Sequence, residues 1–198
     1  MAKLYFHYAA MNAGKSTSLL QASFNYRERG METLIFTAAI DTRSDKGSVA
    51  SRIGLKADAE SFDEHTDLYS KIEMFIRDNA IDCIFVDEAQ FLTSQQVMQL
   101  ARVADELNTP VMCFGLRTDF RGELFPGSAR LLAIADDIRE LKAICHCGKK
   151  ATMNLRTDSK GNSVTSGAQV EVGGNDRYTA LCRRHFYAAI GSYNLATD

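Results

Sequence analysis

The chain has 198 residues, of which 45% are hydrophobic and 24% charged, a composition typical of one globular domain with room for a small appendage. Its net charge of −2 gives no electrostatic reason to expect nucleic acid or an anionic membrane as a partner. No run of about 18 apolar residues predicts a membrane-spanning helix, and the first residues lack the pattern of a signal peptide. We therefore expect a cytoplasmic protein whose five cysteines are buried, metal-bound or reactive rather than paired in disulfides.

The first two thirds of the chain predict strands that alternate with helices. Apolar runs of strand length are followed by segments rich in helix formers and bounded by glycine or proline. The predicted strands are 3–8, 33–38, 81–86 and 111–116, and the predicted helices are 15–29, 67–79, 94–108 and 126 to about 135. Residues 40–59 show no clear period, so we expect them to form a long, mobile, functional loop.

This alternation predicts an α/β fold in which a parallel sheet has helices on both faces. Right-handed crossovers bring the loops after the strands to one edge of the sheet, where ligands bind. Three such loops, 9–16, 87–91 and 117–126, carry most of the polar chemistry, and we expect them to form one site. We expect the strand 81–86 to lie beside the first strand.

The composition of the sequence changes near residue 144, where cysteines, glycines and polar residues replace the long apolar runs. We predict an α/β domain over residues 1–143, a small domain over 144–192 and a flexible tail over 193–198. A unit of roughly 50 residues cannot bury a large core, so a bound metal ion would help the small domain to fold.

A phosphate-binding loop is predicted at the start of the chain, between the first strand and the first helix. Successive backbone N–H groups at the positive end of a helix attract the phosphates of ATP. Lys15 can reach the β- and γ-phosphates, and the Ser16 hydroxyl can ligate Mg²⁺. The usual first glycine is replaced by Ala9, so the loop must begin in a conformation that an L-residue adopts readily. The whole segment reads Ala9, Ala10, Met11, Asn12, Ala13, Gly14, Lys15 and Ser16.

An acidic pair, Asp87-Glu88, ends the predicted strand 81–86 and is expected, with Ala89 and Gln90, to border the ATP site. Asp87 can hold Mg²⁺, and Glu88 can accept a proton from the attacking nucleophile. That nucleophile is either a substrate hydroxyl, as in a kinase, or water. The segment also looks like the Asp-Glu-Ala-Gln box of helicase-type ATPases, but the remaining chain is too short for their second domain and has no evident basic channel. An acidic loop that is merely solvated is the third alternative.

Two short clusters of cysteine and histidine predict a closed tetrahedral site for structural Zn²⁺. The candidate ligands are Cys145, Cys147, Cys182 and His185, and they leave no open position for catalysis. The Cys-x-Cys spacing is tighter than usual, so His146 could replace one of its neighbours, and free buried thiols are the alternative. The remaining cysteines and histidines are expected to be structural: Cys83, Cys113, His7 and His65.

Taken in order, several segments of this chain resemble the cellular-type (type II, tetrameric, zinc-containing) thymidine kinases, most closely those of enteric bacteria. The resemblance covers almost the whole chain, and its most specific segments are 8–17, 86–92, 115–125 and 172–178 together with the cysteine–histidine set. It implies a RecA-like P-loop fold with a small zinc-containing lasso domain. It also implies transfer of the γ-phosphoryl group of ATP to the 5′-hydroxyl of thymidine.

The resemblance further implies roles for individual residues. Glu88 matches the proton acceptor, and Arg43, in a mobile loop, could stabilise charge on the transferring group. Phe120 matches an aromatic residue that stacks on thymine, Met11 lies near the 5-methyl group, and Tyr178 bonds to the sugar. The lasso loop that closes on the nucleoside is matched by Val170, Glu171, Val172, Gly173 and Gly174. A homotetramer and feedback inhibition by dTTP are implied as well.

Overall fold

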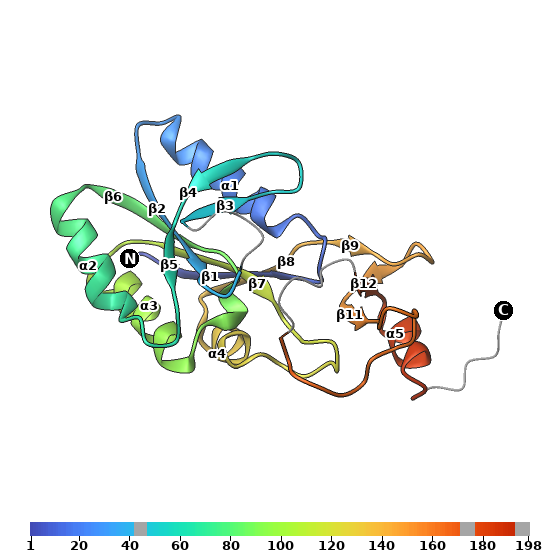
Figure 1. Cartoon of the computed structure of the whole chain (residues 1–198). Helices are drawn as coiled ribbons and strands as arrows, with labels where there is room; N and C mark the ends of the chain where they lie inside the picture. Colours follow the sequence, from blue (N-terminus) through green and yellow to red (C-terminus); the bar gives the residue numbers. More distant parts are fainter. Residues whose placement is uncertain (42–46, 171–176, 193–198) are drawn as a thin grey trace.

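The computed structural model describes residues 1–41, 47–170 and 177–192. At its centre lies a six-stranded sheet in the order β5-β2-β6-β7-β1-β8, in which every neighbouring pair is parallel (Figure 1). The predicted α/β class with a parallel sheet is confirmed. The strands of this sheet are β1 (Leu4–Ala9), β2 (Glu32–Ala38), β5 (Glu60–Phe62), β6 (Ile81–Val86), β7 (Val111–Leu116) and β8 (Asp137–Glu140).

Helices cover both faces of the sheet, as predicted. One face packs against α2 (Leu68–Asp78), α3 (Ser94–Glu106) and α4 (Pro126–Ile134), whose buried side chains share a core with Phe6 and Ile84. On the other face α1 (Lys15–Arg27) packs Leu19 against the buried side chains of the strands. Two-sided coverage explains why the central strands are mostly apolar.

Capping side chains fix where two of the helices begin. Asp67 accepts a hydrogen bond from the backbone N–H of Ser70 at the start of α2. Thr93 and Gln96 form a reciprocal capping box at the start of α3. Each pair satisfies N–H groups that have no partner inside the helix, so these starts lie within one residue of the predicted ones.

The expected place of β6 beside β1 is wrong, because β7 lies between them. Val111 of β7 pairs with Leu4 of β1 on one side and with Ile84 of β6 on the other. All three strands are mostly apolar, and an apolar run does not show which position a central strand takes in the order of the sheet. The edge strands β5 and β8 escape prediction because they are short and carry charged residues, as edge strands often do.

Residues 40–59 are not the structureless loop that their composition predicts. Within the described part, β3 (Ser48–Ala50) and β4 (Lys56–Asp58) form an antiparallel hairpin. Val49 anchors it, since this side chain is 2% exposed and belongs to the core beside α1. One or two apolar residues per strand are too weak a signal for a periodicity argument. Residues 42–46 lie outside the described residues.

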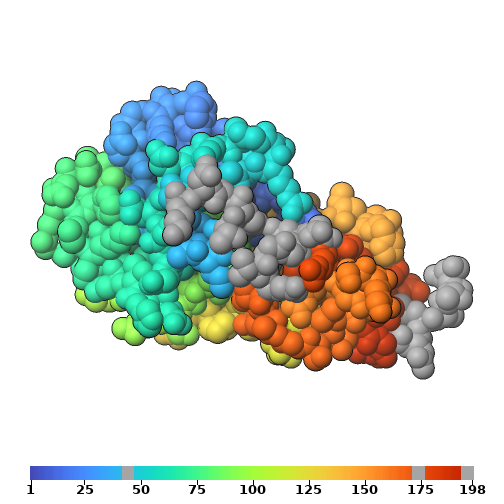
Figure 2. Space-filling view, in the orientation of Figure 1, coloured from blue at the N-terminus to red at the C-terminus, as the bar shows by residue number. Residues whose placement is uncertain are grey.

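The small C-terminal region forms its own lobe, drawn orange to red on the right of Figure 2. Its elements are β9 (Ala143–Ile144), β10 (Lys150–Ala151), β11 (Met153–Arg156), β12 (Tyr178–Leu181) and α5 (Arg183–Ala189). They enclose a separate small core that also contains Ala10 of the phosphate loop. The division at 143/144 stays a prediction, and the predicted tail 193–198 lies outside the described residues. No helix in the described part of the chain is both long and apolar enough for a membrane span.

Candidate active site

One pocket of about 300 Å³ lies where the loops after β1, β6 and β7 meet. The predicted convergence of these three loops is confirmed. The tip of the β3–β4 hairpin and the small lobe add further walls to the same pocket. Its polar and aromatic lining includes Lys15, Ser16, Asp41, Glu88, Gln90, Phe120, Asn154, Gln169 and Tyr178.

The phosphate loop has the geometry that anion binding requires. Left-handed conformations at Asn12 (φ 63°) and Gly14 (φ 78°) turn the chain, so that α1 starts at the pocket. Lys15 is 8% exposed, and its Nζ donates to the carbonyl oxygen of Ala10 at 3.2 Å. Ala9 ends β1 and is not among the residues with positive φ, so an alanine fits there without strain.

The two predicted magnesium ligands are hydrogen-bonded to each other, and Ser16 lines the pocket. The Ser16 hydroxyl donates to Oδ2 of Asp87 at 2.7 Å, although the residues are 71 positions apart. Asp87 is 2% exposed, and its Oδ1 accepts from the backbone N–H of Glu88. A hydroxyl and a carboxylate are the hard oxygen ligands that Mg²⁺ prefers, so the residues present fit this ion.

Glu88 lines the pocket, with an unusual backbone conformation and a side chain that Gln90 holds by a hydrogen bond. Its backbone is left-handed (φ 53°, ψ 38°), a conformation that costs a non-glycine residue on the order of 1–3 kcal/mol and clusters at functional sites. Gln90 donates through Nε2 to Oε2 of Glu88, and its Oε1 accepts from the backbone N–H of Leu116. The amide of Gln90 thus fixes the Glu88 carboxylate relative to the end of β7, and its contact with ATP stays a prediction.

Aromatic and apolar side chains provide surfaces for a planar ring. Met11 and Phe120, both predicted at the nucleoside site, line the pocket. Phe91 and Phe125 also line it and pack edge to face, with ring centroids 6.0 Å apart. These two escape prediction because an isolated phenylalanine in a turn more often belongs to the core, and only the fold brings them to this cavity.

Asn154 connects the small lobe to two of the three loops, and nothing in the sequence singles it out. It lies on β11 and is 2% exposed. Its Oδ1 accepts from the backbone N–H of Met11 at 2.7 Å, and its Nδ2 donates to the carbonyl oxygen of Thr118 at 3.2 Å. The pairing is invisible in the sequence because Met11 is 143 residues away.

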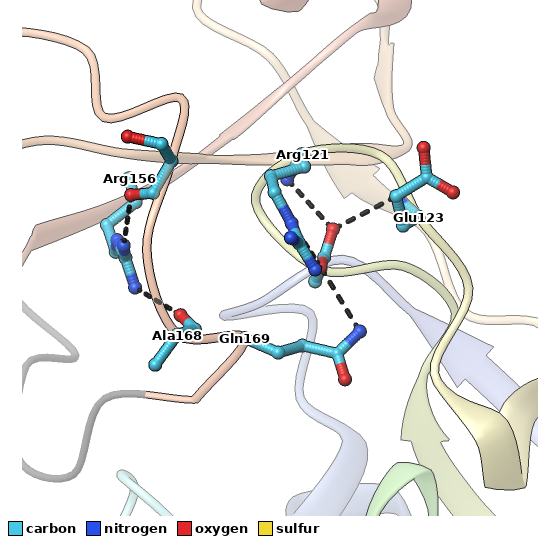
Figure 3. Close-up of polar contacts among 7 residues, drawn as sticks. Arg121, Glu123, Arg156, Ala168 and Gln169 are labelled. Atoms are coloured by element: carbon cyan, nitrogen blue, oxygen red, sulfur yellow. Dashed lines mark hydrogen bonds and ion pairs between the residues drawn. The ribbon is translucent and has the colours of Figure 1, made fainter.

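A second connection joins the segment 166–170 to the loop 117–126 (Figure 3). Asp119 has a fully buried side chain that pairs with the Arg121 guanidinium and accepts from Nε2 of Gln169 at 3.1 Å. Nearby, Arg156 donates to the carbonyl oxygens of Ala168 and Ser166. Val170 and Tyr178, the described ends of the predicted lasso, both line the pocket.

The four predicted metal ligands form one cluster. Ligand atoms of Cys145, Cys147, Cys182 and His185 all lie within 4.8 Å of one another. The sulfurs of Cys147 and Cys182 are 3.9 Å apart, and Nδ1 of His185 is 3.4 Å from the sulfurs of Cys145 and Cys182. A tetrahedral zinc ion requires about 3.8 Å between sulfurs and about 3.5 Å between sulfur and nitrogen, so the residues fit Zn²⁺. The His146 ring instead stacks on that of His185.

Local hydrogen bonds prepare one thiol of this cluster for a metal. Burial alone would raise the pKa of the Cys145 thiol, but backbone N–H groups of Cys147 and Cys182 and the His185 ring lower it to about 6. The thiolate is the form that ligates metals. The hydrogen bonds therefore favour the form of Cys145 that binds a metal ion.

The two cysteines outside the metal cluster are core residues, as predicted, and the structural role expected for His7 and His65 stays a prediction. Cys83 and Cys113 are fully buried in β6 and β7, and burial raises the pKa of the Cys83 thiol to about 12. His7 stacks on Phe114 with ring centroids 4.6 Å apart, and burial lowers its pKa. His65 has an exposed side chain. None of these four belongs to the metal cluster or lines the pocket within the residues that the structure describes.

Five predicted site residues lie outside the described residues, and their roles stay predictions. These are Arg43 in the segment 42–46, and Glu171, Val172, Gly173 and Gly174 in the segment 171–176.

Comparison with known proteins gives a consistent match. A family model described as thymidine kinase matches residues 2–186. The chain is 63% identical to the thymidine kinase of Novosphingobium aromaticivorans over 191 residues, which cover 96% of this chain and 100% of the relative. It is 62% identical to the thymidine kinase of Agrobacterium fabrum over 186 residues, 94% of this chain and 96% of the relative. For the thymidine kinase of Yersinia pseudotuberculosis the identity is 58% over 190 residues, 96% and 97% of the two chains.

Proposed function

The chain belongs to the thymidine kinase family, and we propose that it transfers the γ-phosphoryl group of ATP to the 5′-hydroxyl of thymidine with Glu88 as the proton acceptor. One observation carries the mechanism: the Glu88 carboxylate and the phosphate loop border the same pocket. A carboxylate beside a phosphate-binding loop suits deprotonation of a hydroxyl next to the transferred group.

The triphosphate binds at the N-terminus of α1. Backbone N–H groups of residues 9–16 and the Lys15 ammonium attract its oxygens. Ser16 and Asp87 would hold Mg²⁺, which supplies positive charge to the β- and γ-phosphates when it is bound. Arg43 adds a further positive charge near the transferring group in this proposal.

Glu88 accepts the proton of the 5′-hydroxyl as that oxygen attacks the γ-phosphorus. Gln90 keeps the carboxylate oriented through the hydrogen bond to Oε2. The buried position of Glu88, 7% exposed, limits access of water that would otherwise compete as the nucleophile.

Thymidine occupies the part of the pocket lined by aromatic residues. Phe120 offers its ring for stacking, Met11 lies beside the 5-methyl group, and Tyr178 bonds to the sugar. Backbone groups of Val170 and of residues 171–174 pair with the polar edge of thymine.

We include three features of the assembled protein in the proposal. Structural Zn²⁺ holds the two ends of the small lobe together through the cysteine–histidine cluster. The product-like nucleotide dTTP acts as a feedback inhibitor, since its base and triphosphate suit the two halves of one pocket. The protein is a cytoplasmic homotetramer; its five cysteines form no disulfide, which agrees with a reducing compartment.

Substrate-dependent release of ADP tests this function. With ATP and Mg²⁺, we expect ADP to form with thymidine and at much lower rates with deoxycytidine, deoxyadenosine or deoxyguanosine. ADP that forms equally without nucleoside and increases with single-stranded DNA would contradict the proposal and support the helicase-type alternative.

A further inference from the structure

Arg156 lies behind the aromatic wall of the pocket. Its guanidinium carbon is 3.6 Å from the centroid of the Phe120 ring, and the two residues are 6% and 1% exposed. A guanidinium stacked at this distance attracts the ring face electrostatically, and the effect is larger in a site without water. One face of Phe120 is therefore covered by Arg156.

The same guanidinium holds the segment that leads into the predicted lasso (Figure 3). Nη1 donates to the carbonyl oxygen of Ala168 at 3.1 Å, and Nη2 donates to that of Ser166 at 3.3 Å. Gly167 lies between them with φ 119°, and a Cβ there would come within 3.1 Å of Nη2. The backbone at 166–168 thus folds around the planar fork of Arg156 in a conformation that L side chains rarely adopt.

Arg156 acts on the pocket from outside it. Phe120, Gln169 and Val170 are among the described residues that line the cavity, whereas Arg156 is not. Gln169 adds a second attachment of this segment to the loop 117–126 through Asp119. Arg156 therefore contacts both the Phe120 ring and the residues just before the wall at 169–170, whereas the Gln169–Asp119 bond holds that wall independently of Arg156.

We propose that Arg156 is a positioning residue that sets the separation between the Phe120 ring and the wall at 169–170, and so the fit of the pyrimidine ring. The inference rests on the proposed nucleoside site. A lysine in its place keeps the charge but has no planar fork, so it cannot stack and hold two carbonyl groups together. The space for the pyrimidine ring then changes and thymidine binds more weakly, while the geometry of the phosphate loop is unchanged.

The test compares Arg156→Lys with the native protein. We expect the Kd of thymidine, measured by calorimetry without ATP, and the thymidine KM to rise roughly 10- to 100-fold, with the KM of ATP changed less than about threefold. Zinc content and thermal unfolding establish that the variant is folded. Arg102→Lys is the matched control, because Arg102 also combines a ring contact with a forked ion pair, over Tyr69 and with Glu106, on the exposed side of α3.

A second variant keeps the test decisive if Arg156→Lys does not fold. Gly167→Ala disturbs the Nη2 contact at an exposed position and leaves Arg156 in place; we expect the thymidine Kd to rise about tenfold. A thymidine Kd within twofold of the native value in either folded variant would overturn the inference. If the native protein binds no thymidine, the proposed function fails instead, so the two failures are distinguishable.

Discussion

The proposed phosphate half of the pocket and its proposed nucleoside half are built in different ways. The phosphate half consists of residues 9–16 and 87–90, which follow directly on β1 and β6. The nucleoside half depends on contacts between distant segments, such as Asn154 with Met11 and Gln169 with Asp119, 143 and 50 residues apart. In the proposed function, short motifs thus supply the chemistry of phosphoryl transfer, whereas the packing of the small lobe selects the acceptor.

The largest expected effect concerns Glu88, where the two halves meet. Glu88→Gln should lower kcat roughly 10²- to 10⁴-fold, because an amide accepts no proton from the 5′-hydroxyl. Thymidine affinity should change little, since the side chain keeps its size and its contact with Gln90. Steady-state kinetics and calorimetry measure the two quantities. Glu123→Gln, the same change on an exposed residue of the loop 117–126, is the control. If Glu88→Gln lowered only the affinity for thymidine and left kcat unchanged, Glu88 would not be the proton acceptor.

The second-largest effect should follow loss of the metal, which we expect to affect the nucleoside half more than the phosphate half. Metal analysis should find about one zinc per chain, and Cys182→Ser should lose it. Without this attachment the small lobe loosens, so the thymidine KM should rise at least about tenfold, with a smaller change for ATP. Cys83→Ala, which alters a core thiol outside the cluster, should retain its zinc. A zinc-free Cys182→Ser protein with native kinetics would contradict the role of the cluster.

Removing one connection between the lobes should have a smaller effect. Asn154→Ala leaves the backbone N–H of Met11 without its partner, a loss of about 1–3 kcal/mol. Because Met11 belongs to the phosphate loop and borders the nucleoside, we expect the KM values of both substrates to rise several-fold. Asn162→Ala removes one exposed hydrogen bond, from Nδ2 of Asn162 to Asp158, and serves as control. If only the KM of ATP changed, Asn154 would have no part in the nucleoside half.

The same contrast explains what the sequence could predict. The parallel sheet, both helix layers, the phosphate loop, the Asp87-Glu88 pair and the metal ligands could be predicted, because each strand, helix, motif or ligand pair has a signature within a few consecutive residues. The place of β7 between β1 and β6, and the hairpin anchored by Val49, depend on competition between similar apolar segments. Asn154 and Arg156 carry no signal of their own, since a polar residue in a short strand usually faces solvent.

The smallest effect should lie outside both halves. Asp67 caps α2, and hydrogen bonds from the Ser70 hydroxyl and backbone N–H lower its pKa below the usual 3.8. A depressed folded pKa means that this stabilisation is present above about pH 4 and is lost as the pH falls through the folded value. Asp67→Ala should therefore cost about 1 kcal/mol of unfolding free energy at pH 7 and less at pH 2.5, measured by urea denaturation. Asp67→Asn keeps a cap and is the control. A change in either KM would contradict the separation between α2 and the pocket.

A structure of the complex with thymidine and a non-hydrolysable ATP analogue tests the central claim most directly. The account predicts that the 5′-oxygen of thymidine lies about 2.6–3.2 Å from the Glu88 carboxylate, with the γ-phosphate on its other side next to Lys15. A thymidine whose 5′-oxygen lies beyond hydrogen-bonding reach of Glu88, with no bridging water, would contradict it.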